Sequence, residues 1–273
     1  PVSPEGAAGP NRRRCRLSSE LGDQLVRYWR PGRILKLACS REFPEKVAPS
    51  APTGGCAADL TVAIAYDEAF NNYFQDTFDL LELWGASIVD FSPIRDETLP
   101  PETDIVYLGC GRPERYAAAL AENHCMTAAL RSHLAGGGRV YGEGGGAAYL
   151  CQQMETPEGE LKRMVGILPA AARLRRTAAD AAPVDVALAQ PNWLGERRTR
   201  VRGYRDATWD FQPLGPLAGF VAEERHRYDL VGSYRAIGSL LHLDFAAQPK
   251  LLRRFFHRQV PEPEFADPWA VVS

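Results

Sequence analysis

The chain lacks a strong net charge, a long apolar run and a paired-cysteine motif, and each absence excludes a class of protein. Its 273 residues carry a net charge of −2, which argues against a nucleic-acid-binding surface. No apolar run approaches the length of a membrane helix, and no signal peptide opens the sequence. The six cysteines form no C-x-x-C pair, so we expect free thiols and a reducing, cytoplasmic location.

A phosphate-binding loop is also missing. No G-x-x-x-x-G-K-[ST] pattern occurs, and the glycine-rich stretch "GGGRVYGEGGG" contains no lysine to reach a phosphate. We therefore expect no ATP site in this chain, and the spacing of its potential ligands predicts no metal site and no bound cofactor.

The composition allows one large domain with an appendage, because 45% of the residues are apolar. Residues 1–16 are rich in Pro, Gly and Arg and predict a disordered leader. Residues 17–59 predict a helical hinge or linker, with short amphipathic helices broken at Pro31. We assign residues 60–258 to one domain and 259–273 to a Pro-rich tail.

Strand and helix patterns alternate from residue 60 onward. The predicted strands are Leu60–Tyr66, "SIVDFSP", Asp104–Cys110 and "RVYGE"; the predicted helices run from an Asp67 N-cap to Gly85, from Arg115 to Leu134, and through "GGAAYLCQQM". The stripe Phe70, Tyr73, Phe74 and Phe78 is expected to be core. This order predicts an α/β fold with a doubly wound, mostly parallel sheet of the flavodoxin-like class, which binds ligands at the carboxyl ends of its strands.

A predicted strand over Gly238–Phe245 places His242 and Asp244 on the same face. One interpretation is a catalytic base oriented by a carboxylate. The other is a histidine on a sheet face with Asp244 as its salt-bridge partner. Both remain open at this point.

The stretch "VYGEGGGAAYL" has the form of an active-site elbow, in which a strand enters a tight glycine turn and a small-residue helix follows. Its tip, Gly144, has no side chain.

Several stretches together resemble the C-terminal glutamine amidotransferase domain of the cobyrinic acid a,c-diamide synthase family. They are "IAYDEAFNNYFQDTFDLLELWGASIVDFSPIRDETLP", "DIVYLGCGRPERYAAALAEN", "VYGEGGGAAYL", "MVGILP" and "GSLLHLDFAAQP". They follow the family's order over roughly residues 60–248. The resemblance implies a class I glutamine amidotransferase-like domain that hydrolyses glutamine and passes ammonia to a ring carboxylate activated by an N-terminal ATP-using domain.

The resemblance also implies a set of site residues. The family's A-E-C-G-G motif matches residues 142–146, which puts its nucleophilic cysteine at Gly144 and its strand histidine at His242, with Asp244 a departure from the usual pattern. The residues implied to bind substrate are Gly109, Cys110, Gly111, Glu114, Glu143 and Gly145. Glu114 caps the next helix or contacts the amino group of glutamine.

Two departures from the family pattern bear on activity. Gly144 removes the atom that forms the glutamyl thioester, and a replacement thiol would have to come from Cys110 or Cys151, for which a small buried cysteine is the ordinary interpretation. The family's R-G-H-E-F-H-Y-S motif becomes "RGYRDATW", with Tyr204 and Arg205 at the His and Glu positions.

Three functions follow as hypotheses. The first is a glutaminase-impaired amidotransferase domain acting on a tetrapyrrole carboxylate with an ATP-using domain or subunit that holds ATP and Mg²⁺; a homodimer is a further candidate assembly. The second is a non-catalytic binding or assembly module. The third is hydrolysis of another amide by water activated at His242. An arginine-rich second half suits either a polycarboxylate substrate or a solvated surface; its members are Arg173, Arg175, Arg176, Arg197, Arg198, Arg200, Arg202 and Arg205.

Overall fold

The structure, a computed structural model, describes residues 22–23, 27–28, 30–40, 60–176 and 182–256. The chain divides into two units, residues 1–51 and 52–273, which we describe separately. The predicted leader, the Pro-rich tail and the boundary near residue 59 lie outside the described residues. Among the helices of the described part, none is long and apolar enough to cross a membrane.

The first unit contains helix α2 (Pro31–Cys39), which begins at the proline where the sequence predicts a break. Proline suits the first turn of a helix, because the N–H it lacks would have no intrahelical partner there. No residue of α2 is buried, and Ile34, Leu35 and Leu37 are exposed.

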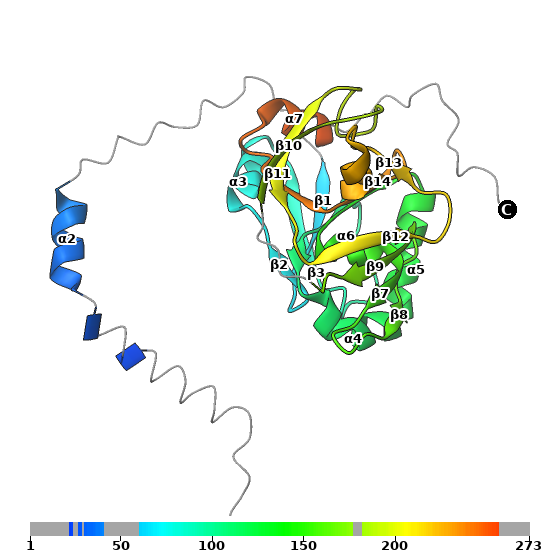
Figure 1. Ribbon diagram of the computed structural model, residues 1–273, viewed down its shortest axis with the longest axis horizontal. Coiled ribbons are helices and arrows are strands. Elements are labelled where there is room, and N and C mark those ends of the chain that lie inside the picture. The colour runs from blue at the N-terminus through cyan, green and yellow to red at the C-terminus, as the bar shows by residue number, and fades with distance from the viewer. Residues whose placement is uncertain (1–21, 24–26, 29, 41–59, 177–181, 257–273) are drawn as a thin grey trace, which may run out of the picture. The chain divides into compact units, whose positions relative to one another are not determined.

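The second unit is built on a seven-stranded sheet with the order β13-β14-β15-β6-β4-β1-β3 (Figure 1). Its strands are β1 (Thr61–Ala65), β3 (Ser87–Phe91), β4 (Ile105–Leu108), β6 (Arg139–Glu143), β13 (Ala218–Gly219), β14 (Leu230–Gly232) and β15 (Ala236–Ser239). The pairs from β15 to β3 are parallel, while β13 and β14 form an antiparallel edge. The predicted α/β fold with a mostly parallel sheet is confirmed.

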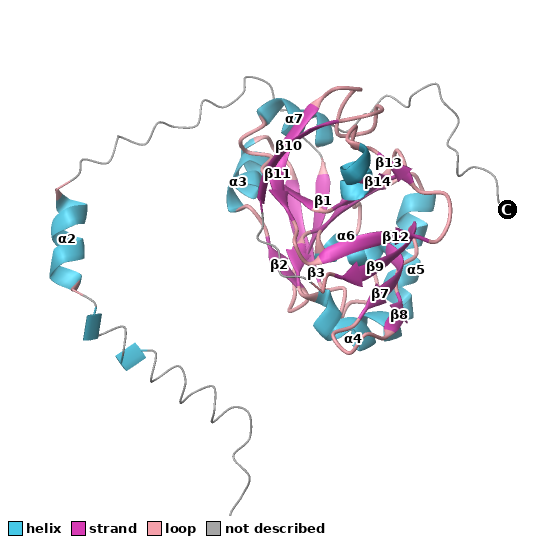
Figure 2. Cartoon of the chain, in the orientation of Figure 1, coloured by secondary structure: helices cyan, strands magenta, loops and turns pink. Residues whose placement is uncertain are grey.

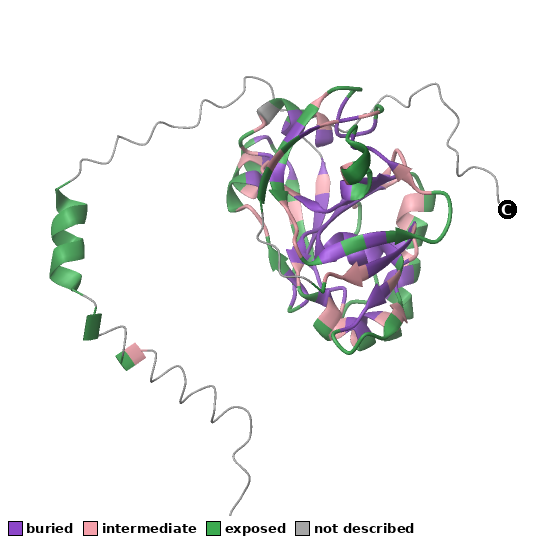
Figure 3. Ribbon diagram, in the orientation of Figure 1, coloured by how far each residue is buried: buried purple, intermediate pink, exposed green. Residues whose placement is uncertain are grey.

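Helices cover both faces of this sheet, because side chains alternate along each strand. They are α3 (Gln75–Leu83), α4 (Ala117–Glu122), α5 (His124–Ala135), α6 (Gly145–Leu150) and α7 (Pro249–Phe255), with 3₁₀ turns η1 (Pro113–Tyr116) and η2 (Glu224–Asp229). Val106 and Val140 belong to a core shared with α4, α5 and α6. Tyr107 and Tyr141 belong to a second core shared with α3 and α7. The buried strands run through the middle of the unit in Figure 3.

Three small sheets complete the second unit (Figure 2). One has the order β12-β9-β7-β8, another β10-β11-β16, and the third pairs β2 with β5. Their strands are β2 (Phe70–Asn72), β5 (Cys110–Gly111), β7 (Cys151–Glu155), β8 (Leu161–Arg163), β9 (Leu168–Leu174), β10 (Ala182–Ala187), β11 (Arg200–Arg205), β12 (Trp209–Pro213) and β16 (Leu241–Leu243).

Two predicted helices differ from the structure. The helix expected to run from Gly145 to Met154 ends at Leu150, because the chain from Cys151 onward pairs with β8 and β9 as β7. The helix expected from Arg115 to Leu134 is interrupted at Asn123, whose side chain accepts the Met126 N–H and caps α5.

The predicted helix start at Asp67 is also wrong. Its buried carboxylate accepts the N–H groups of Ala69 and Phe70, the Ser92 hydroxyl and the Ile94 N–H. Asp67 therefore ties the loop before β2 to the end of β3, and α3 begins only at Gln75. This shift takes Phe74 out of the expected core stripe.

Candidate functional site

The turn between β6 and α6 has the backbone of a strand-to-helix elbow. Gly144 at its tip has φ 50° and ψ −110°, which a residue with a side chain adopts only at a cost of about 1–3 kcal/mol. The Gly144 N–H donates to Ser239 O of β15 at 2.7 Å and fixes the turn against the sheet. A close approach follows in α6, where a Cβ added to Gly146 would overlap the Leu108 carbonyl.

The space beside Gly144 is filled by other side chains. A Cβ at residue 144 would lie 2.5 Å from Asp206 Oδ2 and 3.0 Å from Cys110 Sγ. These two groups therefore occupy the volume into which a nucleophile on the elbow would project.

Glu143, the last residue of β6, is the centre of a buried hydrogen-bond network. Its Oε1 accepts the Tyr141 hydroxyl at 2.7 Å and the Leu243 N–H at 3.0 Å. Its Oε2 accepts the Tyr107 hydroxyl at 3.0 Å and lies 2.6 Å from His242 Nδ1. The sequence-based assignment of Glu143 to substrate binding implied that it lines the cleft. In the structure Glu143 is not among the lining residues and instead holds the surrounding side chains in place.

His242, on β16, is held between this carboxylate and an aromatic ring. Its imidazole stacks on Phe74 with ring centroids 4.2 Å apart and planes at 17°. Burial acts to lower the pKa of His242, but the Glu143 carboxylate outweighs it, and the net pKa is raised.

The expected pairing of His242 with Asp244 is wrong. The strand ends at Leu243, so the face alternation used in the prediction stops before Asp244. The Asp244 carboxylate instead accepts the Ala247 N–H at 3.0 Å. Asp244 contributes only a minor electrostatic effect at His242, and Glu143 is the hydrogen-bonded carboxylate.

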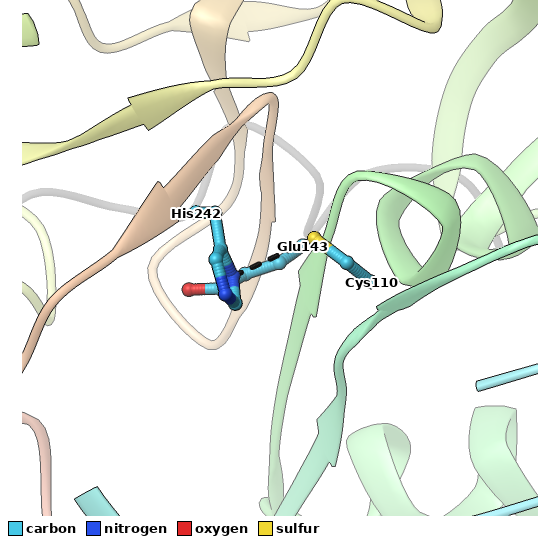
Figure 4. Close-up of side chains that lie close together, drawn as sticks. All are labelled: Cys110, Glu143 and His242. Carbon is cyan, nitrogen blue, oxygen red and sulfur yellow. Dashed lines mark hydrogen bonds and ion pairs between the residues drawn. The ribbon is translucent and has the colours of Figure 1, made fainter. Parts of the chain in front are cut away.

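Cys110, on β5, brings a buried thiol to the same point. Its Sγ lies 3.5 Å from His242 Nδ1, and the side chains of Cys110, Glu143 and His242 converge in Figure 4. Burial raises the pKa of the Cys110 thiol well above its ordinary value, and the Glu143 and Asp206 carboxylates raise it further. The predicted state of the cysteines is confirmed for the described ones, since Cys39, Cys110, Cys125 and Cys151 are free.

A cleft of about 550 Å³ opens beside this cluster. It is lined by Asn71, Asn72, Cys110, Gly111, Arg112, Tyr204, Arg205, Asp206, Ala207, Thr208 and His242. Sequence reasoning missed Asp206, although it stands inside the "RGYRDATW" stretch that was singled out as a departure from the expected pattern.

The remaining predicted substrate-binding residues lie around the cleft in different roles. Gly109 donates its N–H to the Tyr73 hydroxyl at 2.9 Å, and Gly145 packs against Pro113. Glu114 stands in the first turn of η1, where burial raises its pKa, and its Oε2 is buried without a hydrogen-bond partner. Of this group, Cys110 and Gly111 line the cleft.

Five of the eight arginines in the second half form ion pairs within the chain, which favours a solvated surface over a substrate site. Arg175 pairs with Asp210, Arg176 with Glu155, Arg200 and Arg202 with Asp185, and Arg205 with Asp229.

A comparison with known families identifies the family of the chain. Residues 61–248 match the profile of the CobB/CobQ-like glutamine amidotransferase domain. The chain belongs to this family. It is 34% identical to cobyrinate a,c-diamide synthase of Salmonella typhimurium over 228 residues, covering 81% of this chain and 50% of that protein. The synthase of Dehalococcoides mccartyi is 32% identical, with 82% and 50% covered.

Solved structures support the fold alone. A glutamine amidotransferase crystal structure aligns with a TM-score of 0.53 at 17% identity, covering 71% of this chain and 96% of that one. PurLQS from Thermotoga maritima aligns with a TM-score of 0.53 at 13% identity, covering 72% and 95%. The chain spans about half the length of the curated relatives it matches.

Proposed function

We propose that the chain is the amidotransferase domain of a synthase that amidates carboxylate side chains of a corrin-type tetrapyrrole, and that it no longer hydrolyses glutamine through residue 144. The named relatives, cobyrinate a,c-diamide synthases, support the substrate class. An ATP-using domain or subunit, with its Mg²⁺, activates the ring carboxylate elsewhere, and ammonia reaches it without cleavage of glutamine at this elbow.

The observation that carries the loss of glutaminase activity is the elbow itself. Its tip is a glycine with φ 50°, so no sulfur or oxygen is available there to attack the amide carbon. A histidine–carboxylate pair that suits a base is present beside the elbow, since His242 Nδ1 lies 2.6 Å from Glu143 Oε2. The site therefore retains the supporting groups of an amide-cleaving enzyme and has lost the group that forms the covalent intermediate.

The surroundings of Gly144 support this proposal. Asp206 and Cys110 fill the place of the missing side chain. A Gly144→Cys substitution alone therefore meets Asp206 Oδ2, which must rotate away before the new thiol can reach His242.

Ammonia release from glutamine by the purified chain tests the loss of activity. We expect no turnover above background for the wild type, little for Gly144→Cys, and a clear gain for Gly144→Cys combined with Asp206→Ala. Cys151→Ala is the matched control, because it removes a buried thiol that bonds Ala147 O outside the cleft. Turnover by the wild type that disappears in Cys110→Ala would refute the proposal and identify Cys110 as the working nucleophile.

The filled elbow also favours a second candidate, a non-catalytic binding or assembly module. A chimera separates the two functions: residues 60–258 replace the matching half of the Salmonella typhimurium relative, and amidation of cobyrinic acid is followed with ATP and either glutamine or ammonium chloride. Amidation with ammonium but not with glutamine supports the proposed function. No amidation with either, while the chimera still binds cobyrinic acid, supports the binding module.

A further inference from the structure

Three different ligand atoms converge at the inner end of the cleft. Cys110 Sγ, Glu143 Oε2 and His242 Nδ1 come from β5, β6 and β16, and one such atom from each residue lies within 4.8 Å of the others. Cys110 and Glu143 are buried and His242 is half-buried. A thiolate, an imidazole and a carboxylate are the ligand types that Zn²⁺ takes in proteins.

One of the two measured ligand distances matches a tetrahedral zinc site, and the other is shorter. Ordinary Zn–S and Zn–N bond lengths place the two ligand atoms about 3.5 Å apart, and Cys110 Sγ lies 3.5 Å from His242 Nδ1. The nitrogen and oxygen ligands of such an ion lie about 3.4 Å apart, whereas His242 Nδ1 and Glu143 Oε2 are 2.6 Å apart. An ion that replaces the proton between them therefore requires the two side chains to separate by about 0.8 Å.

The groups behind these ligands already hold them in place. The Tyr141 hydroxyl and the Leu243 N–H donate to Glu143 Oε1. Glu143 Oε2 accepts the Tyr107 hydroxyl and faces His242. Phe74 fixes the plane of the imidazole from the other side. Hydrogen-bonded and packed support of this kind is a regular feature of metal sites.

Asp206 stands beside these three ligands on the side of the cleft. The place that a side chain on Gly144 would take has Asp206 Oδ2 at 2.5 Å and Cys110 Sγ at 3.0 Å. Asp206 is thus near enough to serve as a fourth ligand, directly or through water. Arg205, which lines the cleft, pairs with Asp229, so a divalent cation would add positive charge between the Glu143 and Asp206 carboxylates.

We propose that Cys110, Glu143 and His242 bind one Zn²⁺ ion, with the fourth position open to the cleft. Binding releases two protons to solvent, the thiol proton of Cys110 and the proton held between His242 Nδ1 and Glu143 Oε2, and the imidazole keeps its remaining proton on Nε2. Sequence spacing alone predicts no metal site here, because Cys110 and His242 are 132 residues apart and Glu143 and His242 are 99 apart. Zinc binding requires neither glutamine nor a tetrapyrrole, so it is independent of the proposed function.

Metal content and Co²⁺ substitution test this site. The full chain is expressed without a polyhistidine tag in zinc-supplemented medium, dialysed into metal-free buffer and analysed by mass spectrometry for metals. We expect about one zinc ion per chain. After replacement by Co²⁺, we expect a thiolate-to-cobalt charge-transfer band and the visible bands of a tetrahedral ion.

Variants locate the ligands. Cys110→Ala and His242→Ala should each weaken Co²⁺ binding roughly tenfold or more, and the charge-transfer band should vanish in Cys110→Ala. Cys151→Ala, which removes another buried thiol, should keep both zinc and band. Should Cys110→Ala fail to fold, the wild-type spectrum and its retention in Cys151→Ala still decide whether a cysteine binds the ion. Absence of stoichiometric zinc together with absence of the band would overturn the proposal, as would full zinc retention in folded Cys110→Ala, which marks an adventitious ion only.

Discussion

Replacing Glu143 by glutamine should destabilise the chain in a pH-dependent way. Glutamine keeps the shape of Glu143 but removes the negative charge that stabilises the His242 imidazolium. The Leu243 N–H requires an acceptor at Oε1, so the amide NH₂ must take the Oε2 position and face His242. Breaking a buried pair of this kind costs about 3–5 kcal/mol when one charge is left unpaired.

The sign of the pH dependence follows from the raised pKa of His242. Its contribution to stability is fully present below its unfolded pKa, about 6.5, and is lost as the pH rises through the folded pKa. The free energy of unfolding should therefore differ between wild type and Glu143→Gln by about 3 kcal/mol or more at pH 5.5. At pH 8.5 the difference in the free energy of unfolding should fall to about 1–3 kcal/mol, which is the cost of the hydrogen bonds that glutamine cannot make with correct donors and acceptors.

Urea denaturation of the EDTA-treated, metal-free proteins at the two pH values measures these differences, and NMR titration of the histidine ring protons reports the pKa of His242 directly. Asp244→Asn is the matched control, since it removes a nearby carboxylate whose hydrogen bond to the Ala247 N–H an asparagine oxygen can also accept. We expect this variant to leave stability and the pKa of His242 almost unchanged. Equal destabilisation by Glu143→Gln at both pH values, or a larger pKa shift in Asp244→Asn, would contradict the assigned pairing.

Two further predictions concern the elbow and the thiol beside it. Gly146→Ala should lower the free energy of unfolding by about 3 kcal/mol in urea denaturation, because the new Cβ overlaps the Leu108 carbonyl, which cannot rotate away. The control Gly215→Ala should have little effect, because its Cβ meets its nearest neighbour at an ordinary 3.5 Å. Similar losses of stability in both variants would refute this reasoning. After EDTA treatment, Cys110 should react with iodoacetamide at least roughly tenfold more slowly than exposed Cys125 at pH 8, because the pKa of Cys110 is raised and its thiol is buried. Peptide mapping measures the two rates, and equal rates would show that the Cys110 thiol is accessible and ionised.

Local patterns were sufficient where one segment determines its own structure. The apolar runs at β1, β4 and β6 predicted buried parallel strands because such strands are covered on both faces. The glycine turn after β6 was recognised as an elbow for a similar reason, since the turn is encoded by adjacent residues. Local patterns failed at Cys151, where a helical sequence becomes β7 because β8 and β9 offer pairing partners.

The partner of His242 shows the limit most clearly. Spacing along one strand pointed to Asp244, two residues away, whereas the structure supplies Glu143, 99 residues away in the chain. Strand β15 of the main sheet ends at Ser239. Leu241–Leu243 forms β16, which pairs with β11 in a different sheet. A change of sheet within a few residues leaves no signal in the apolar pattern.

The sequence by itself determined the family, the α/β sheet and the glycine at the tip of the elbow, because each depends on residues close together in the chain. The tertiary structure alone decided which groups fill the space beside that glycine and which carboxylate supports the histidine. Those contacts join β6 to β5, β16 and the Asp206 loop. β5 follows β4 and β16 follows β15, and β4 and β15 flank β6 in the main sheet, so these groups meet only when that sheet assembles.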